Sequence, residues 1–515
     1  MSVTIRKRLQ AINEWLMTLL GSSKFFYGIV ALLVLQAGWI ALTARYPQAF
    51  DENYHLGLIK LHVEYGLLPF FSYQPEGASV YGAVISDPSY LFHYLMSLPY
   101  WLLSGLTSNE TVQIIALRLI NIGLFVWGLF VYRRLLAELK ISRPLQNIVM
   151  LVFVLLPVVP LLAAHINYDN LMVPITGLLF LYVVRYINYL RSRPVMAPLI
   201  PVRMLLLILL FGAIGSVIKF AFAPILLATI VTVTAATIFY YVMSRIKPRG
   251  LRQLFDTSGR RWILVLIAFA TLLAVGLSFE RYGMNLVQYG SPVPKCHKVL
   301  SIDECMDYSP WARDYKYSQI YPRPTAQGYA VYPFVWVWRM VYETMFTITS
   351  RTYPPSDKVY YYGFSPLIVA HVVAWIGVAG GVLGIIVFWR RIRRNRPLTV
   401  LLGITVFYAI ILFIQNFSMY HHSGEAVAIH GRYLVPVYPV LLVCLAIGWR
   451  GLLERFGGLR YSAVVFLVLI ILFMQGGGIT NWLIRSNAEW YWPGNQAALQ
   501  VNNTLKSVVD RVVIH

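Results

Sequence analysis

The chain has 515 residues, of which 58% are hydrophobic and only 12% charged, and its formal net charge is +22. This composition excludes an ordinary soluble globular protein, because such proteins carry about twice this share of charged residues. The basic excess alone would suit a nucleic-acid-binding protein, so its distribution along the predicted elements decides between that class and a membrane topology.

Eleven apolar stretches are close to the ~20 residues that cross a bilayer as a helix. The 35 tyrosines and 14 tryptophans suit the aromatic belts that mark membrane interfaces. The sequence therefore predicts an all-α polytopic membrane protein, a bundle of about 11 spans within a range of about 10–13. The predicted spans are residues 25–43, 113–131, 145–163, 169–188, 204–219, 222–243, 262–279, 364–388, 398–416, 433–449 and 461–477.

Basic residues collect on one side of this predicted topology. With the N-terminus in the cytoplasm, the cytoplasmic segments hold 26 cations and four acids, whereas the outer segments and span ends hold 17 of each. The excess thus lies on one face, as the positive-inside rule expects. The basic charge therefore reports topology and predicts no nucleic-acid partner. The expected location is a bacterial inner membrane, with the C-terminus outside and the first span an uncleaved anchor.

Two helices are expected to lie in the outer interface instead of crossing the membrane. The first covers residues 51–67, where apolar side chains at helical spacing form one face: Leu56, Ile59, Val63 and Leu67. The second covers residues 88–105, because a span there would carry Arg133–Arg143 to the outer side. Both helices place polar chemistry at the outer surface.

A larger outer loop, rich in Tyr, Trp and Pro, divides the chain into parts. The predicted parts are an N-terminal transmembrane module at 1–279, an extracytoplasmic loop module at 280–363, transmembrane helices within 364–477 and an outer tail at 478–515. In the loop module, Cys296 and Cys305 can form a disulfide outside the cytoplasm or remain two free thiols, and the sequence leaves both open.

Ionisable residues at the outer ends of the spans form the candidate site. They are Asp51 and Glu52 after the first span, Asp169 at the fourth, Lys219 in the tight turn after the fifth, and Arg432 before the tenth. Such groups cost least at span ends, where they can face a cavity. Arginine and lysine suit a phosphate, and a carboxylate beside them can accept a proton from an attacking hydroxyl. The set predicts a transferase with a lipid-phosphate donor.

The motifs also follow a distinctive order. After the first span come Asp51-Glu52, an interfacial helix, Gly66–Pro69, a second interfacial helix, and a span from Arg118-Leu119 to Arg133-Arg134; later come Asn167-Tyr168-Asp169, the Gly215–Pro224 turn around Lys219, and Gly431–Pro436. Over residues 25–230 and 425–450 this order resembles the GT-C superfamily of membrane glycosyltransferases. It is most similar to the branch of protein O-mannosyltransferases and the lipid A aminoarabinose transferase, and to a related uncharacterised bacterial family.

The resemblance implies an inverting transfer of a sugar from a polyprenyl-phosphate donor on the outer side. Asp51 would be the general base, Glu52 a positioning or substitute carboxylate, and Asp169 the residue that orients the acceptor or a basic partner. Lys219 and Arg432 would hold the donor phosphate. Residues expected to bind acceptor or substrate are His55, Tyr168, His430 and Tyr433. The expected partners are the donor, a cell-envelope glycan or lipid-linked acceptor such as an O-antigen, and membrane lipids.

Each candidate also has a plainer interpretation. Asp51 and Asp169 can cap helices, Lys219 can be an interfacial lysine, and Arg432 can bind any lipid headgroup. Residues of metal-ligand type stand in the last outer loop, but their spacing fits no template: His421, His422, Glu425 and His430. A divalent metal therefore stays open, and no other cofactor is predicted.

Two other function classes stay open as well. An O-antigen ligase or polymerase also acts on polyprenyl-linked glycans outside the membrane, although such enzymes lack an early Asp-Glu pair. A lipid-glycan flippase or transporter would bind its substrate near the bilayer midplane, often between inverted repeats. The mid-span positions here are almost free of charge and no repeat is visible, which disfavours transport.

Overall fold

A computed structural model describes residues 3–47, 49–192, 202–244, 261–345, 367–455 and 462–513. These parts of the chain are helical apart from turns and one isolated β-bridge between Ala44 and Tyr491. Within them, nine helices are long and apolar enough to cross a membrane. Two shorter apolar helices, α6 (Arg143–Val154) and α9 (Val202–Ile218), stand at two other predicted spans. The predicted fold class, an all-α polytopic membrane protein, is confirmed.

The long apolar helices follow the predicted spans closely. They are α2 (Ser23–Thr43), α5 (Glu110–Glu138), α8 (Asp169–Arg191), α10 (Ala223–Ser244), α11 (Arg261–Ser278), α16 (Ile368–Val387), α18 (Arg396–Ser423), α19 (Tyr438–Arg455) and α20 (Ser462–Met474), which reaches spanning length together with α21 (Ile479–Arg485). Asparagine caps fix where two of them begin. The Asn109 side chain accepts from the N–H of Val112 in α5, and Asn395 accepts from Leu398 in α18. Such caps satisfy N–H groups that have no partner in the first helical turn.

The predicted span at 145–163 is not one continuous helix. α6 ends at Val154, and α7 (Val158–Ala163) follows after a turn that contains Pro157. Proline lacks an N–H and disfavours helical backbone in the residue before it, so the helix ends ahead of Pro157. The prediction of a single span is therefore corrected to two short helices, which lead into the turn at His165–Tyr168.

The helix before the loop module extends past residue 280, the predicted start of that module. α11 continues through a π-helical turn (Phe279–Gly283) into α12 (Met284–Tyr289), so the apolar helix extends to Tyr289. The module then contains α13 (Ile302–Asp307), α14 (Ser309–Ile320) and α15 (Ala326–Met345). Cys296 and Cys305 form a disulfide in front of and within α13. Residues 346–363 of the module, and the basic residues at 193, 245–260 and 460, lie outside the described residues.

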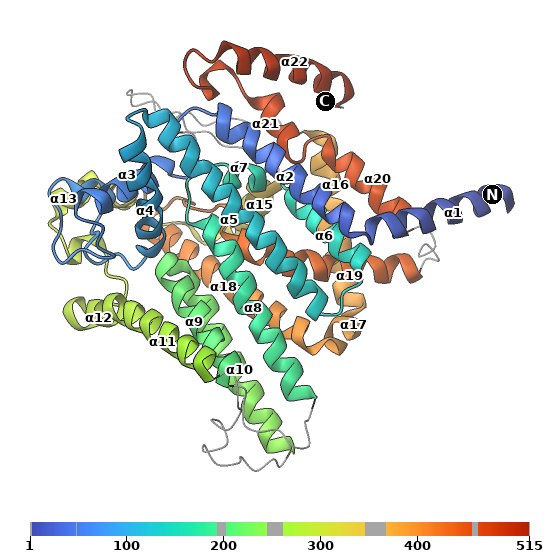
Figure 1. The fold of residues 1–515 in the computed structure, drawn as a ribbon, viewed down its shortest axis with the longest axis horizontal. Helices are drawn as coiled ribbons and strands as arrows, with labels where there is room; N and C mark the ends of the chain where they lie inside the picture. Colours follow the sequence, from blue (N-terminus) through green and yellow to red (C-terminus); the bar gives the residue numbers. More distant parts are fainter. Residues whose placement is uncertain are drawn as a thin grey trace.

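The bundle has two chemically different ends. Figure 1 shows α3 (Glu52–Glu64), α4 (Leu91–Leu106) and α13 gathered at one end, and α1 (Val3–Leu20) and α17 (Trp389–Arg394) at the other. α3 and α4 lie where the two interfacial helices are predicted, and we call this end of the bundle the site end. The opposite end carries Arg133, Arg134 and the arginines of α17, and we call it the basic end. α1 has no counterpart among the predicted elements.

Helix pairs build one core between these ends. α5 packs along α8, and α16 packs along α19. The second pair meets at Gly384 and Gly448, where a Cβ on either residue would overlap the backbone of the other helix. Small residues permit this close approach between membrane helices, where lipid gives little hydrophobic driving force.

The C-terminal tail returns to the site end. The predicted tail helix at about 497–513 is α22 (Gln496–Val512), preceded by α21 (Ile479–Arg485). Between them, the N–H of Trp492 donates to the carbonyl of Thr43 at 3.1 Å, and the N–H of Arg45 donates to the carbonyl of Trp490 at 2.8 Å. The tail thus holds the chain just after α2, where the loop toward Asp51 begins.

Candidate active site

The turn at Phe50-Asp51 has an unusual backbone. Both residues adopt left-handed conformations, with φ of 58° and 59°, although neither is a glycine. Such a conformation costs a non-glycine residue about 1–2 kcal/mol, so the surrounding structure has to hold it. Asp51 stands at the N-cap position of α3, yet its side chain makes no cap hydrogen bond. The carboxylate is instead 64% exposed. Helix capping therefore does not account for this aspartate.

Arg118 from α5 holds the loop before this turn. Its guanidinium is fully buried and donates from Nε and Nη2 to the two oxygens of Glu52, at 2.8 and 2.7 Å. The remaining bonds go to the carbonyls of Ala41, Ala44 and Arg45. One arginine thus joins the end of α2 to the first residue of α3. Because an arginine inside an apolar helix requires an internal partner, its position in the sequence signals such an anchor.

Glu52 differs from its neighbour Asp51 in both exposure and bonding. Its carboxylate is fully buried and also accepts from the N–H of Ile166 at 3.2 Å. Burial opposes its charge, but the Arg118 guanidinium and these hydrogen bonds keep the pKa of Glu52 below its usual value. Glu52 is therefore ionised and held by Arg118 and by the N–H of Ile166. No part of its carboxylate is exposed, whereas a substitute base would have to reach an acceptor hydroxyl.

Asn167 holds the same turn from the other side. Its Nδ2 donates to the carbonyl of Phe50 at 2.9 Å and lies 3.0 Å from Nε2 of His55. Its Oδ1 accepts from the N–H of Asp169 at 2.8 Å. One amide side chain therefore fixes the turn at Asp51 and the start of α8 relative to each other.

His55 continues this hydrogen-bond chain into the core. His93 Nδ1 lies 3.1 Å from the carbonyl of Ser89, and His55 Nδ1 lies 2.9 Å from His93 Nε2. Because a carbonyl can only accept, we assign the proton of His93 to Nδ1, so His55 donates to His93 and accepts from Asn167. Burial lowers the pKa of both histidines well below the usual value, and both are neutral. The structure places His55 in a supporting chain rather than on the site surface.

A second ion pair lies beside the turn. Lys219, between α9 and the short 3-10 helix Phe220–Phe222, places Nζ 2.5 Å from Oδ1 of Asp169, and both side chains are buried. The ammonium also lies 4.5 and 4.6 Å from the ring centres of Tyr168 and Tyr433. Burial, together with the positive charge of Arg432, lowers the pKa of Lys219 to about 8, although Asp169 opposes the shift. Two aromatic faces and one carboxylate thus enclose this cation.

Arg432 completes the group. Its Nη2 donates to Oδ2 of Asp51 at 2.8 Å, and its guanidinium lies 5.4 Å from the ring centre of Tyr433. The N–H of Arg432 donates to His430 Nδ1 at 3.0 Å, so His430 caps the 3-10 helix Gly431–Val437 that leads into α19. The predicted residues Asp51, Asp169, Lys219 and Arg432 therefore lie together in two neighbouring ion pairs, and the rings of the predicted residues Tyr168 and Tyr433 lie beside Lys219.

Two buried polar atoms in this group lack a hydrogen-bond partner. They are Oδ2 of Asp169, which can accept, and Nε of Arg432, which can donate. A buried polar atom without a partner costs about 1–3 kcal/mol, so each has to be explained. A ligand that offers a hydroxyl to Asp169 and an anionic oxygen to Arg432 satisfies both atoms.

The residues of metal-ligand type do not gather. Among the described residues, no group of three or more His, Cys, Asp or Glu side chains is arranged to hold a metal ion. His421 bonds to the hydroxyl of Tyr329 at 2.7 Å, and His422 bonds to the carbonyl of Ser418 at 2.6 Å. Within the part of the chain that the structure describes, the side chains of His421, His422, Glu425 and His430 thus do not form a group that could hold a metal ion.

Tyr308 of the loop module lies near the site, although the sequence does not predict it as a site residue. The ring of Tyr308 lies 6.2 Å from that of Tyr54 in α3, and Ser79 donates to Asp307 at 2.7 Å. The Cys296–Cys305 disulfide fixes the helix that ends just before Tyr308. The sequence carried no spacing signal for this contact, because it joins segments more than 200 residues apart.

No protein-family model matches the chain, and no curated protein matches it. Solved structures do. Over 88% of this chain, the archaeal oligosaccharyltransferase AglB from Archaeoglobus fulgidus, in complex with an inhibitory peptide and a dolichol-phosphate, matches with 15% identity and a TM-score of 0.41. The Archaeoglobus fulgidus oligosaccharyltransferase in its apo form matches over 92% of this chain, with 14% identity and a TM-score of 0.40. Its complex with Zn and sulfate also matches over 92% of this chain, with 13% identity and a TM-score of 0.39.

The chain spans 55%, 60% and 56% of the length of these solved structures. All three are structures of an oligosaccharyltransferase. Identities and TM-scores this low assign no role to any residue of this chain. The chain is an all-helical, multi-pass membrane protein whose predicted ionisable residues meet at one end of the bundle.

Proposed function

We propose that this protein is a GT-C-type glycosyltransferase that transfers a sugar from a polyprenyl-phosphate donor to a hydroxyl of a cell-envelope glycan or lipid-linked acceptor. The observation that carries the proposal is the pair of adjacent ion pairs, Asp51–Arg432 and Asp169–Lys219, with one exposed carboxylate and two cations. The site end faces the extracytoplasmic side in this proposal, and the N-terminus is cytoplasmic.

The donor phosphate is recognised by the two cations. Arg432 offers a planar guanidinium, and Lys219 offers a compact charge beside it. When the phosphate binds, its oxygens replace the carboxylates of Asp51 and Asp169 as the partners of these cations. The Nε of Arg432, which has no partner within the protein, becomes one of the donors to the phosphate. The same exchange releases Asp51 to act on the acceptor.

The transfer then follows as one displacement at the anomeric carbon. The acceptor oxygen forms a bond to that carbon, the bond from the carbon to the phosphate oxygen breaks, and the acceptor proton moves to Asp51. The configuration inverts, because the nucleophile and the leaving group lie on opposite faces of the sugar. Polyprenyl phosphate leaves with the added negative charge, which Lys219 and Arg432 stabilise. Asp169 accepts a hydrogen bond from a hydroxyl of the bound substrate.

Asp51→Asn tests the base. We expect turnover of a polyprenyl-phosphate sugar by the purified protein to fall by about 10²–10⁴-fold, the range typical of general-base catalysis. Donor affinity should be retained or increased, because the amide no longer competes for Arg432. Asp303→Asn, an exposed residue in α13, is the matched control and should leave turnover unchanged. Full turnover by Asp51→Asn would reject the base assignment.

The phosphate clamp has a separate test. Lys219→Ala and Arg432→Ala should each weaken donor binding, because each removes a charge that faces the phosphate. Unchanged affinity of both variants for a polyprenyl-phosphate donor would reject the proposed donor class. The ionisable groups of the site stand at helix ends, not near the bilayer midplane where a flippase would bind its substrate. No observation among the described residues specifically supports an O-antigen ligase.

A further inference from the structure

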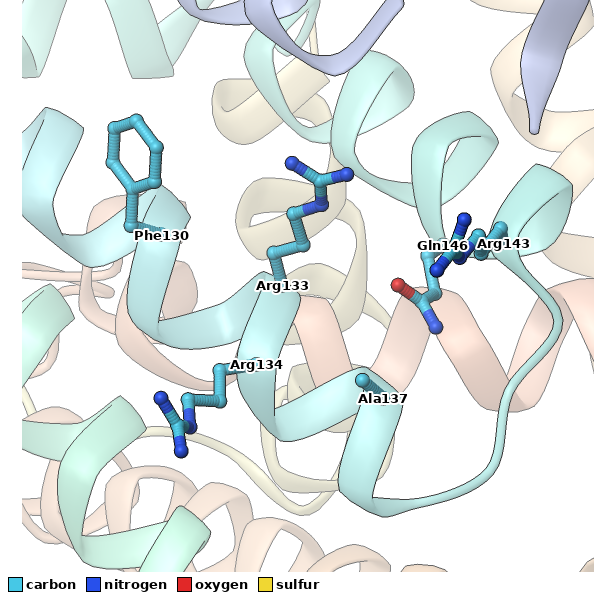
Figure 2. Close-up of a pocket in the computed structure, with 6 residues that line it drawn as sticks. All are labelled: Phe130, Arg133, Arg134, Ala137, Arg143 and Gln146. Carbon is cyan, nitrogen blue, oxygen red and sulfur yellow. The ribbon is translucent and has the colours of Figure 1, made fainter. Parts of the chain in front are cut away.

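A pocket of about 270 Å³ lies at the basic end, between the last turns of α5 and the first turn of α6. Its lining residues are Phe130, Arg133, Arg134, Ala137, Arg143 and Gln146. Figure 2 shows Arg133 and Ala137 on α5, with Arg143 and Gln146 across from them on α6. Arg133 lies about 22 Å along α5 from Arg118 at 1.5 Å per residue, so this pocket is separate from the candidate active site.

The pocket gathers positive charge without an anion to balance it. Among the described residues, none of its three arginines forms an ion pair with a carboxylate. The nearest acid in sequence, Glu138, pairs with Arg185 at 2.9 Å. Like charges in a partly enclosed space repel one another, and an anion from outside the chain would relieve this repulsion.

Arg133 is already oriented for such an anion. Its Nη2 donates to the hydroxyl of Ser23 at 3.1 Å, and its guanidinium lies 4.1 Å from the ring centre of Phe26. Both partners belong to the start of α2, which fixes the arginine from one side. A guanidinium held in this way loses little freedom on binding, and its planar fork matches a phosphate.

An apolar surface continues from the pocket along the outside of the bundle. Phe130 on the pocket wall, Trp127 one turn away in α5 and Tyr27 on α2 are all exposed. The ring of Phe26 packs edge to face on Phe130, with 5.3 Å between ring centres. A charged pocket joined to an exposed apolar strip fits a molecule with a phosphate at one end and hydrocarbon at the other.

α1 also contacts the membrane on the side where the pocket lies, the basic end of the bundle. Its C-terminal half packs through Leu16 and Leu20, and Figure 1 shows the helix extending from the bundle at the basic end. The exposed apolar residues lie within one face at helical spacing: Ile5, Ile12, Trp15 and Leu19. Such a helix lies in the interfacial layer of a bilayer. The headgroup layer therefore runs past the pocket.

We infer that the pocket binds the phosphate of an anionic phospholipid from the leaflet at the basic end. Arg133 and Arg143 bind the phosphate, and the acyl chains lie along Phe130 and Tyr27. Basic pockets between membrane helices suit anionic headgroups, whose attraction adds to that of the apolar strip. The inference is independent of the proposed transferase function.

Native mass spectrometry of the purified full-length chain tests this site. The protein is titrated with phosphatidylglycerol, and separately with phosphatidylcholine of the same acyl chains. We expect wild type to retain phosphatidylglycerol preferentially. R133Q/R143Q should bind it about thirtyfold more weakly, because each basic side chain near the membrane surface contributes a factor of about five. R393Q/R394Q removes the same charge from exposed positions of α17 and should bind like wild type.

Three results would overturn the inference. They are equal retention of phosphatidylglycerol by wild type and R133Q/R143Q, equal retention of both lipids by wild type, and release of the lipid by inorganic phosphate at matched concentration. The last result would show that the pocket recognises a free phosphate. If the double variant does not fold, R143Q replaces it, because Arg143 is exposed at the start of α6. Its affinity should fall by about fivefold, and an unchanged affinity would reject the site.

Discussion

Arg118 and Arg133 belong to the same helix, α5, but meet opposite environments. Arg118 is fully buried and bonded to the carboxylate of Glu52 and to three backbone carbonyls. Arg133 is half-buried, and no described carboxylate pairs with it. The difference separates two uses of a cation in a membrane protein. Where the fold provides the anion, the cation holds the fold together; where it does not, the cation is available to an anion from outside.

The largest expected effect is the loss of stability when Arg118 is replaced. Arg118→Met should destabilise the protein by about 3–5 kcal/mol, because it leaves the buried charge of Glu52 without compensation. The midpoint of thermal unfolding in detergent measures the loss. R118M/E52Q should recover part of it, since no buried charge then remains. A wild-type midpoint for Arg118→Met would contradict the anchoring role.

The second effect concerns the turn that Arg118 and Asn167 hold together. Asn167→Ala removes the donor to the Phe50 carbonyl and to His55 Nε2. Turnover should fall by about 10–100-fold, because unpaired buried groups cost about 1–3 kcal/mol and the backbone at Asp51 can relax. Donor affinity should stay near wild type. Asn109→Ala, which removes only a helix cap, is the control for stability. Equal turnover in both variants would argue against positioning by Asn167.

A third effect concerns Lys219, whose partner Asp169 is replaced by the donor phosphate in the proposed function. Because the pKa of Lys219 is lowered to about 8, the free protein loses this charge as pH rises through about 8. Donor affinity should then fall, by up to about tenfold per pH unit above that value. Lys219→Arg stays charged in this range, so its affinity should be flat. The same pH dependence in both proteins would assign the effect to another group.

The smallest effect is expected at Arg133. Arg133→Gln should lower stability by about 0.5–1 kcal/mol in a neutral detergent, because it removes an exposed hydrogen bond to Ser23 and a cation–π contact with Phe26 but no paired charge. Turnover under the same conditions should match wild type. A loss of stability comparable to that of Arg118→Met would remove the distinction between the two arginines.

Much of the site follows from the sequence. Asp51, Asp169, Lys219 and Arg432 all stand at span ends on the charge-balanced side, and such positions converge when spans pack as a bundle. The pairing within the set does not follow, because spacing along the chain says nothing about which carboxylate meets which cation. Nor does the distinction between Asp51 and Glu52 follow, since two adjacent acids differ only once α5 brings Arg118 to one of them.

The fold, like the site, can be predicted from the sequence only in part. Hydropathy locates the spans, since length and apolar content are local properties. It misses the break near Pro157, because the residues around that proline are apolar throughout. It also misses α1, whose mixed polar and apolar residues resemble the basic segment that normally precedes a first span. The break comes from the proline itself, whereas the position of α1 depends on packing against α6 and α20.

The tail has a consequence for biosynthesis. The backbone bonds from Trp492 to Thr43 and from Arg45 to Trp490 join segments more than 440 residues apart, so the second segment is translated long after the first. Arg432, which binds Asp51, is also synthesised late. The first span and the loop after it therefore enter the membrane long before their partners exist. The contacts around Asp51 therefore assemble only after residue 492 has been translated, and no shorter N-terminal fragment contains all of them.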